Sequence, residues 1–363
     1  MATITNGLPP SEIKEGSGLS RWLRRTAYTR AAYVYLIPAF LIMAVITFYP
    51  MFYQVWMSFT DFGIANITGK VAPNPVGFDN YVGILPKVIK FFGAEISIAK
   101  GGVLAAKIPN FSFFRILAFN LVWVIFNVPI HVILGILVAL VLNTPGLWGK
   151  KIYRAIYVFP TVLPWLVVAT IWRNMFDQDY GSINMSLAWI GNLFNIPAEA
   201  FRIRWMEDIY PPFQWFLPGL PLPLAFFAML VTNIWMGWPF NCIVATGALQ
   251  SIPKDLYEAA SIDGANGFQQ FWSITAPLLR PAMIPAAMVG MIITFNLFNC
   301  IYFMSGGGPL RQTEILVTTA YNLVNAQRLY GAAAAFCVLI FFILFALTLI
   351  TNRITRATER YDV

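Results

Sequence analysis

The chain has 363 residues, of which 58% are apolar and 11% charged, and its mean hydropathy is +0.67. Soluble domains are about 45–50% apolar and about 25% charged, so these values exclude an ordinary water-soluble enzyme and indicate an integral membrane protein. The net charge of +8 does not indicate nucleic-acid binding, because the basic residues are scattered at the ends of apolar blocks, where they serve membrane topology.

Six apolar segments are long enough, at about 17–25 residues, to cross a bilayer as helices. In chain order they are Tyr33–Met57, Ile116–Leu142, Ala155–Trp172, Leu222–Leu249, Ile284–Met304 and Ala332–Ile350. None contains Asp, Glu, Lys or Arg, and several contain proline, so we expect kinks or broken turns that pack inside protein. The sequence therefore predicts an all-α membrane protein with about six transmembrane helices.

Basic residues near both ends of the chain predict its orientation. They are Arg21, Arg24, Arg25 and Arg30 before the first span, and Arg353, Arg356 and Arg360 after the last. The positive-inside rule places residues 1–32 and 351–363 in the cytoplasm, and residues 58–115 and 174–221 outside as two insertions. The first insertion carries many basic residues, but loops of this length follow the rule poorly.

The two insertions differ in composition. Residues 85–108 carry lysines among apolar residues, and we expect them to form a helix that lies flat at the membrane surface. Residues 174–221 contain Trp and Tyr that are typical of an interfacial belt, although a role in contacting a ligand also stays open.

Few residues offer chemistry for a metal or redox site. Cys242, Cys300 and Cys337 are widely spaced inside apolar blocks, which favours a packing role. His131 is the only histidine, so a zinc site built from histidines is excluded, and we expect its imidazole to be bonded within the helix bundle. The sequence predicts no metal site.

The spans also lack an evident energy source. Intramembrane carboxylates or lysines usually mark a proton or sodium pathway, and the predicted spans have none. The string Gly146–Lys151 has the wrong glycine spacing for a phosphate loop and no Ser or Thr after its lysine. We therefore expect the chain to bind no cofactor and to lack an ATPase site. A sodium-driven secondary carrier stays an alternative, because broken helices can coordinate sodium through backbone carbonyls.

A membrane enzyme is a third alternative, and it would need clustered carboxylates or histidines at the interface. The only close acidic pairs near a span are Asp177 with Asp179 and Glu207 with Asp208. This composition disfavours an enzyme.

The cytoplasmic segment between the fourth and fifth spans, Ser251–Pro281, is the most informative. We expect Ser251 to cap a helix at Lys254–Ile262, glycines to allow a sharp turn, and a second helix at Phe268–Thr275 that Pro277 and Pro281 end. Its apolar side chains are too many for a solvated loop. The segment either folds against the membrane face or docks on a soluble partner.

The spacing within this segment resembles the EAA motif, EAA-x3-G-x9-I-x-L-P, of permeases from binding-protein-dependent ABC importers. The matching residues, with the adjacent aspartate, are Glu258, Ala259, Ala260, Asp263, Gly264, Ile274 and Pro277, while Ala276 replaces the usual leucine. Further likeness runs from Arg154 to the C-terminus and includes Pro160, Pro164, Trp172, Phe176, Gly181, Asn184 and Gly307-Gly308-Pro309. The larger membrane subunit of maltose-type importers is the most similar form.

The resemblance implies the MetI-like ABC permease fold in a bacterial or archaeal cytoplasmic membrane. It implies a second permease subunit, two ATP-binding subunits that hold ATP and Mg, and an extracytoplasmic sugar-binding protein as partners. In such a system Glu258 faces basic groups in a cleft of the ATPase, and Gly264 sets the angle between the two short helices.

A sugar needs amide or hydroxyl partners and an aromatic face in a water-lined cavity. We expect Asn296 and Asn299 to lie on one helix face with Phe295 beside them, although buried asparagines also join helices. The resemblance implies that Met236, Gly237, Phe240, Ile292, Phe295, Asn296 and Asn299 line the sugar site. Phe240 and Ile292 replace polar residues of the maltose-type subunit, which implies that the pocket makes fewer hydrogen bonds to its sugar or holds a different sugar. The resemblance implies a di- or oligosaccharide as the substrate class.

Overall fold

The computed structural model describes residues 33–91, 94–209 and 222–355. The chain divides into two compact units, residues 1–56 and residues 57–363, and each is described by itself. In the first unit, one apolar helical stretch begins at Tyr33 and runs through the π-helical turn η1 (Ala44–Phe48) into α2 (Tyr49–Met57). The basic residues that predict the orientation of residues 1–32 lie outside the described residues, as do Arg356 and Arg360.

The second unit is built on long helices, because a chain in lipid has to satisfy its backbone hydrogen bonds internally. Its three longest uninterrupted helices are α6 (Phe113–Asn143), α10 (Leu224–Ser251) and α16 (Tyr330–Thr355). In the described residues, five helical segments are long and apolar enough to span a membrane, and there are six if the bent pair α7–α8 is counted as one span. The predicted number of spans is therefore confirmed.

The third predicted span, Ala155–Trp172, is not straight. Helix α7 (Lys150–Val162) and helix α8 (Trp165–Met175) meet at an angle of 97°. Pro164 lies between them, and a proline disfavours helical backbone in the residue before it, here Leu163, whose ψ is 136°. The sequence located the proline, and the structure shows that it turns the chain.

The fifth predicted span, Ile284–Met304, is both longer and interrupted. Helix α12 (Gly267–Gln270), the π-helical turn η3 (Phe271–Thr275) and α13 (Ala276–Phe295) follow one another without a gap, and α14 (Phe298–Met304) begins after a two-residue break. The expectation that Pro277 and Pro281 end a short helix is wrong. Pro277 lies in the first turn of α13, where a missing backbone N–H costs little, and Pro281 is tolerated inside the helix.

Residues 85–108 do not form the surface helix that we expected. They form an antiparallel hairpin, β1 (Val88–Phe91) and β2 (Ala94–Ser97), in which Val88 pairs with Ser97 and Ile89 with Ile96, followed by α5 (Val103–Lys107). Short helices α3 (Ile64–Ile67) and α4 (Asp79–Ile84) precede the hairpin. Glycines 101 and 102 separate the strand from α5, and Gly102 has a positive φ of 80°, which interrupts a continuous helix.

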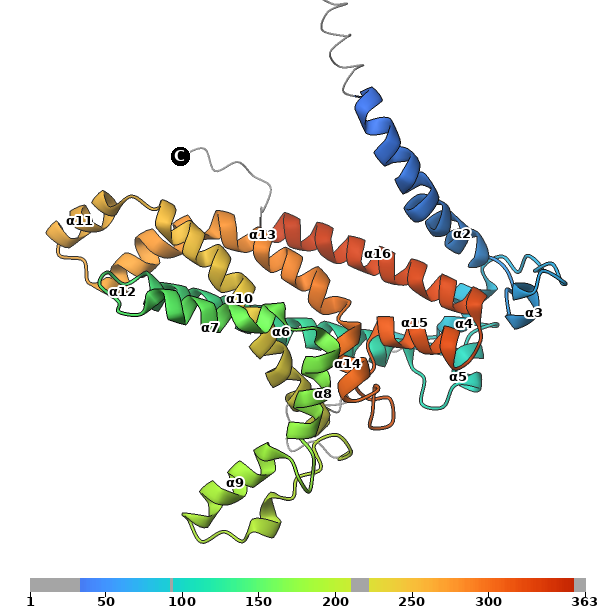
Figure 1. The fold of residues 1–363 in the computed structure, drawn as a ribbon. Coiled ribbons are helices and arrows are strands. Elements are labelled where there is room, and N and C mark those ends of the chain that lie inside the picture. The colour runs from blue at the N-terminus through green and yellow to red at the C-terminus, as the bar shows by residue number, and fades with distance from the viewer. Residues whose placement is uncertain (1–32, 92–93, 210–221, 356–363) are drawn as a thin grey trace, which may run out of the picture. The chain divides into compact units, whose positions relative to one another are not determined.

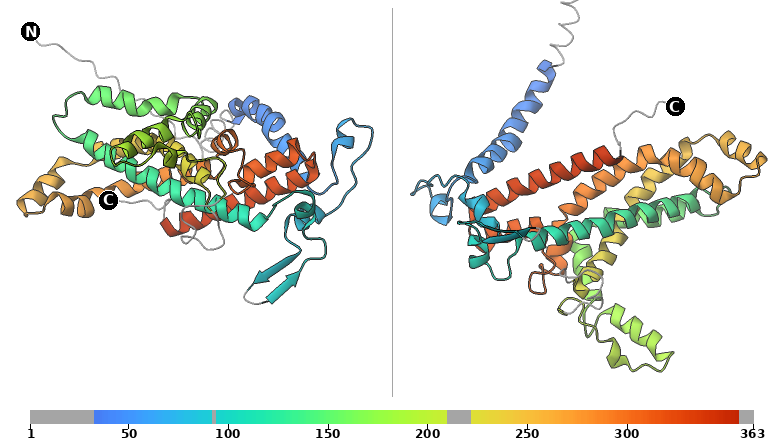
Figure 2. Two further views of the ribbon diagram at one scale, coloured as in Figure 1. Left: turned by 90° about the horizontal axis from the view of Figure 1, so that it is seen from below. Right: turned by 180° about the vertical axis from the view of Figure 1, so that it is seen from behind.

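Helices α6 and α10 pack along each other and form the centre of the second unit, and α13 packs against both. The remaining elements are α9 (Ser182–Asn192), the 3-10 turn η2 (Ala198–Phe201), α11 (Lys254–Ile262) and α15 (Leu316–Asn325). Within the second unit, α11 and α12 lie at one end, and the hairpin with α4 and α5 lies at the other (Figures 1 and 2). This placement separates the EAA segment from the first insertion by the length of the helices.

Candidate functional site

The turn of the EAA segment depends on Gly264. Gly264 has a φ of +79°, a left-handed conformation that favours glycine. The N–H of Ala265 donates to the carbonyl of Ala260 at 2.9 Å, and the N–H of Gly264 donates to the carbonyl of Ser261 at 3.1 Å. These two bonds form a Schellman motif that ends α11. The predicted turn is confirmed, and its geometry fixes where the next helix begins.

Side chains then hold α11 and α12 together as one rigid piece. Asn266 caps α12 through a reciprocal pair of bonds with Gln269, at 2.9 and 2.8 Å. The amide of Gln270 donates to the hydroxyl of Ser261 at 2.9 Å, and the hydroxyls of Tyr257 and Thr275 lie 2.9 Å apart. Ser251 is not the expected cap, because it is the last residue of α10 and its hydroxyl donates to the carbonyl of Ala248.

The EAA segment presents apolar side chains outward. Ile262 is 88% exposed, Phe268 73% and Trp272 58%. Tyr257 and Ile274 point the other way and pack against the buried cluster that includes Leu249. Among the motif residues, Glu258, Ala259, Asp263, Gly264 and Pro277 are exposed, and Ala260 and Ile274 are half-buried. The segment is thus anchored on one face and open on the other.

The second predicted group of residues surrounds the break between α13 and α14. Asn296 ends α13, and its side-chain amide donates to the carbonyl of Ile292 at 3.1 Å. Asn299 lies on the next helix, so the two asparagines do not share one helix face as expected. Ile292 and Asn299 are exposed, Asn296 is half-buried, and Phe295 is fully buried. The structure therefore places the two amides on either side of a break.

The residues of α10 that were predicted to line the sugar site also divide into exposed and buried ones. Phe240 is 43% exposed, whereas Met236 is buried. Gly237 lies against His131 of α6, and a Cβ at position 237 would overlap the imidazole ring. The absence of a side chain at Gly237 therefore serves helix packing, in addition to any role in a cavity.

A buried polar network joins α6 and α10, and sequence reasoning predicted the bonding of His131 but missed that of Asn127 and Asn233. Nε2 of His131 donates to the carbonyl of Asn233 at 3.0 Å, as expected for an imidazole bonded within the bundle. The side chain of Asn233 donates to Asn127 at 2.7 Å, and Asn127 donates to the carbonyl of Trp123 at 2.7 Å. The sequence feature that could have revealed this network is the four-residue spacing of Asn127, His131 and Gly135, which places them on one helix face.

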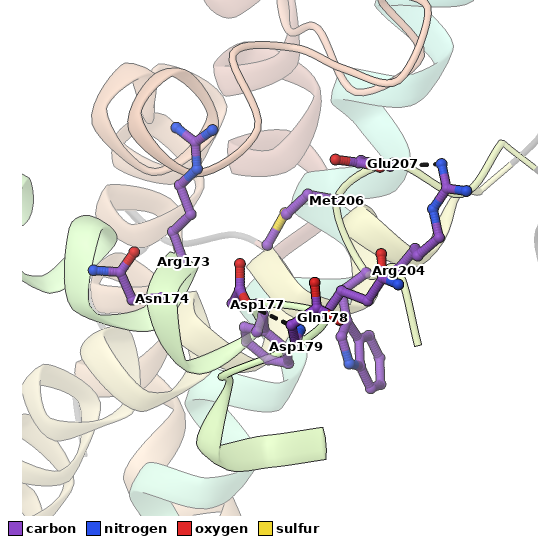
Figure 3. Close-up of a pocket in the computed structure, with 10 residues that line it drawn as sticks. Arg173, Asn174, Asp177, Gln178, Asp179, Arg204, Met206 and Glu207 are labelled. Carbon is purple, nitrogen blue, oxygen red and sulfur yellow. Dashed lines mark hydrogen bonds and ion pairs between the residues drawn. The ribbon is translucent and has the colours of Figure 1, made fainter. Parts of the chain in front are cut away.

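The second insertion holds a polar cavity of about 210 Å³ below α8 (Figure 3). It is lined by Arg173, Asn174, Phe176, Asp177, Gln178, Asp179, Arg204, Trp205, Met206 and Glu207. The carboxylate of Asp177 accepts the N–H groups of Tyr180 and Asp179, both at 2.9 Å, and these bonds lower the pKa of Asp177.

Two other carboxylates of this insertion also have local partners. Asp179 pairs with Arg202, and Glu207 pairs with Arg204 at 3.0 Å. These contacts give Asp177, Asp179 and Glu207 structural roles within their own insertion. Residues 210–221 of this insertion lie outside the described residues.

Comparison with known proteins agrees with this architecture. Residues 100–360 match the family described as the inner membrane component of binding-protein-dependent transport systems. The chain is 30% identical over 340 residues to the maltodextrin transport system permease protein MdxF of Bacillus subtilis. The matched region covers 91% of this chain and 70% of the relative. It is 28% identical over 341 residues to the galactooligosaccharides permease GanP of the same organism, covering 92% and 72%.

A chain of a bacterial ABC transporter that imports alginate has the same fold, with a TM-score of 0.67 and 19% identity over 94% of this chain and 100% of that chain. The protein belongs to the family of inner-membrane components of binding-protein-dependent transporters. It is therefore a multi-pass permease subunit of the bacterial or archaeal ABC-importer type, and the predicted fold class is confirmed.

Proposed function

We propose that this permease subunit moves an oligosaccharide inward across the membrane, driven by ATP hydrolysis on separate subunits. The observation that carries this proposal is the EAA segment, which is rigid, anchored on one face, and exposes Ile262, Phe268 and Trp272 on the other. The relatives are permeases of maltodextrin and galactooligosaccharide systems, and the structural neighbour belongs to an alginate importer, so all three concern oligomeric or polymeric sugars.

The proposed partners are a second permease subunit, two ATP-binding subunits and an extracytoplasmic sugar-binding protein. The solved complex of the alginate transporter with its pentasaccharide-bound periplasmic protein supports the last of these. ATP and Mg bind the ATPase subunits, and this chain binds no cofactor and has no ATPase site of its own. Closure of the ATPase pair moves the docked EAA segments, and the spans then rock between inward and outward openings.

Within the EAA segment, each residue has a physical role in this proposal. Glu258 is exposed on α11 and faces basic groups of the ATPase, while Gly264 fixes the angle at which α12 leaves. Ile274 packs against the helix core and transmits movement into α13, which continues from η3 without a break. Ala259, Ala260, Asp263 and Pro277 complete the docking surface.

The proposed sugar site lies where α10 approaches α13. The amides of Asn296 and Asn299 bond sugar hydroxyls, and the exposed ring of Phe240 offers an apolar face. In this proposal Ile292, which is exposed one turn before Asn296, also lines the site, and Met236, Gly237 and Phe295 complete it. Two amides and few other polar groups suit a sugar that is held loosely enough to be released on the opposite side.

The proposal is tested with the assembled complex. Sugars of increasing length are screened for stimulation of its ATPase activity in the presence of the binding protein, and oligosaccharides are expected to stimulate it. Asn296→Leu should impair sugar uptake more than assembly.

Asn325→Leu is the control, because Asn325, which is exposed on α15, likewise bonds the carbonyl four residues earlier, at 3.1 Å. Equal uptake kinetics in the wild type and in Asn296→Leu would refute the site assignment.

A further inference from the structure

The break between α13 and α14 is held from outside by one residue of α6. The carbonyl of Phe295, the last residue of α13, accepts a hydrogen bond from Nδ2 of Asn120 at 3.2 Å. The carbonyls near the end of a helix have no partner further along the helix, and a buried carbonyl without a partner is costly. Phe295 and Asn120 are both fully buried, so water does not serve as the partner.

The same side chain also caps a second helix. Oδ1 of Asn120 accepts the N–H of Leu316, the first residue of α15, at 2.9 Å. Both ends of one amide are therefore used on two chain segments that lie 175 and 196 positions away in sequence. An asparagine offers one acceptor and one donor group in fixed geometry, which suits this double contact.

The α15 end of this contact is itself held firmly. Glu314, two residues before Leu316, is 2% exposed and accepts bonds from Arg311 at 2.8 Å and Asn322 at 2.9 Å. The hydroxyl of Thr319 donates to the same carboxylate at 3.1 Å. Loop 305–315 and α15 are therefore joined by these bonds, and Asn120 links them to the broken end of α13.

We infer that Asn120 is a positioning residue for the substrate site. It fixes the backbone on which Ile292, Asn296 and Asn299 are presented, without contacting the sugar. This inference rests on the proposed function for its effect on transport. The two hydrogen bonds themselves are tested without any substrate.

The first test is Asn120→Leu, which removes both bonds and keeps the side chain buried. In the assembled complex, the half-saturating oligosaccharide concentration for uptake is expected to rise on the order of tenfold, the equivalent of about one lost hydrogen bond, with the maximal rate nearly unchanged. Hydrogen–deuterium exchange is expected to become faster in the peptides that cover residues 295–298 and 315–318.

Two further variants keep the inference falsifiable. Asn120→Ala also removes both bonds, with a smaller side chain than Leu, so exchange should rise at residues 295–298 and 315–318 as it does for Asn120→Leu. Thr246→Val is the control, because Thr246 is a buried polar residue of α10 that bonds only its own helix, through the carbonyl of Cys242 at 2.7 Å. If Asn120→Leu does not assemble, Asn120→Ala decides the question.

The inference is overturned if the Asn120 variants leave exchange in both peptides and half-saturation unchanged, or if Thr246→Val changes them equally. Absence of oligosaccharide uptake by the wild-type complex would count against the proposed function alone. The exchange measurement would then still decide whether Asn120 holds the two helix ends.

Discussion

The EAA segment and the α6–α10 interface use polar groups in opposite ways. In the EAA segment, hydrogen bonds such as that between Tyr257 and Thr275 join one part of the segment to another, and large apolar side chains remain outside. In the interface, buried groups such as Asn127, His131 and Asn233 bond across two helices. The EAA segment is a preformed surface that needs a partner, whereas Asn127, His131 and Asn233 of the interface bond to groups within it.

This difference predicts that substitutions in the two regions have different effects. Changes in the EAA segment should leave the chain folded and disconnect it from its energy source, because little of the fold depends on the exposed face. Changes in the interface should lower the stability of the chain itself, because a buried polar group or a tight contact has no alternative partner there. The predictions below test that separation, in order of decreasing effect.

The largest effect is expected for Gly264→Pro. Proline holds φ near −65°, whereas Gly264 has a φ of +79°, so the Schellman turn cannot form. Oligosaccharide uptake by the assembled complex should be abolished, and sugar should no longer stimulate its ATPase. Gly267→Ala is the control, because Gly267 has no positive φ and a Cβ there meets nothing within 4 Å. Normal uptake with Gly264→Pro would remove the coupling role.

The second prediction concerns stability. Gly237→Ala should place a methyl group against the His131 ring and cost about 1–3 kcal/mol, as overpacking does in cores. The measurement is the thermal unfolding midpoint in detergent. Gly247→Ala in the same helix should not lower it, because a Cβ at Gly247 has open space. Equal midpoints for Gly237→Ala and the wild type would show that the helices are not in tight contact there.

The third prediction tests the exposed face of the EAA segment. Ile262→Ser should weaken association with the ATPase subunit by roughly tenfold, as loss of an interface anchor does, without changing the unfolding midpoint. Ile354→Ser is the control, because Ile354 is likewise exposed, at 75%, but lies at the end of α16, outside the EAA segment. Binding affinity of the purified subunits is the readout, and equal affinities for both variants would contradict the docking surface.

The smallest effect is expected from Asp177 in the second insertion. Its two backbone hydrogen bonds hold the pKa of Asp177 below the ordinary value of 3.8. The ionised carboxylate therefore stabilises the folded state above pH 3.8, and this stabilisation is lost as the pH falls through the lower pKa of the folded state. Asp177→Asn should therefore lower the unfolding midpoint slightly at pH 7 and not at pH 2. An equal difference at both pH values would show that the charge is not involved.

Hydropathy alone predicted the spans well, because lipid imposes one solution on the backbone. The break after Phe295 was not predictable from its neighbours, because neither Asn296 nor Leu297 is a strong helix breaker, and the supporting bond comes from Asn120 in a distant helix. The hairpin at residues 88–97 was missed because short apolar runs with lysines suit either a strand or a surface helix until their packing is known.

In the candidate site, too, features set by local sequence were predictable and features set by packing between distant segments were not. Gly264 was predictable, because a left-handed turn is a local property that glycine favours. The burial of Met236 and Phe295 and the exposure of Phe240 and Asn299 depend on how α10, α13 and α14 pack, which the sequence pattern of a single helix does not contain.

The central claim is that this chain moves sugar with force supplied by separate ATPase subunits through the EAA segment. The most direct measurement is uptake of a radiolabelled malto-oligosaccharide into proteoliposomes. The account predicts accumulation only when the second permease, the ATPase subunits with ATP and Mg, and the binding protein are all present. Accumulation by this chain alone under a sodium or proton gradient, without ATP, would contradict it.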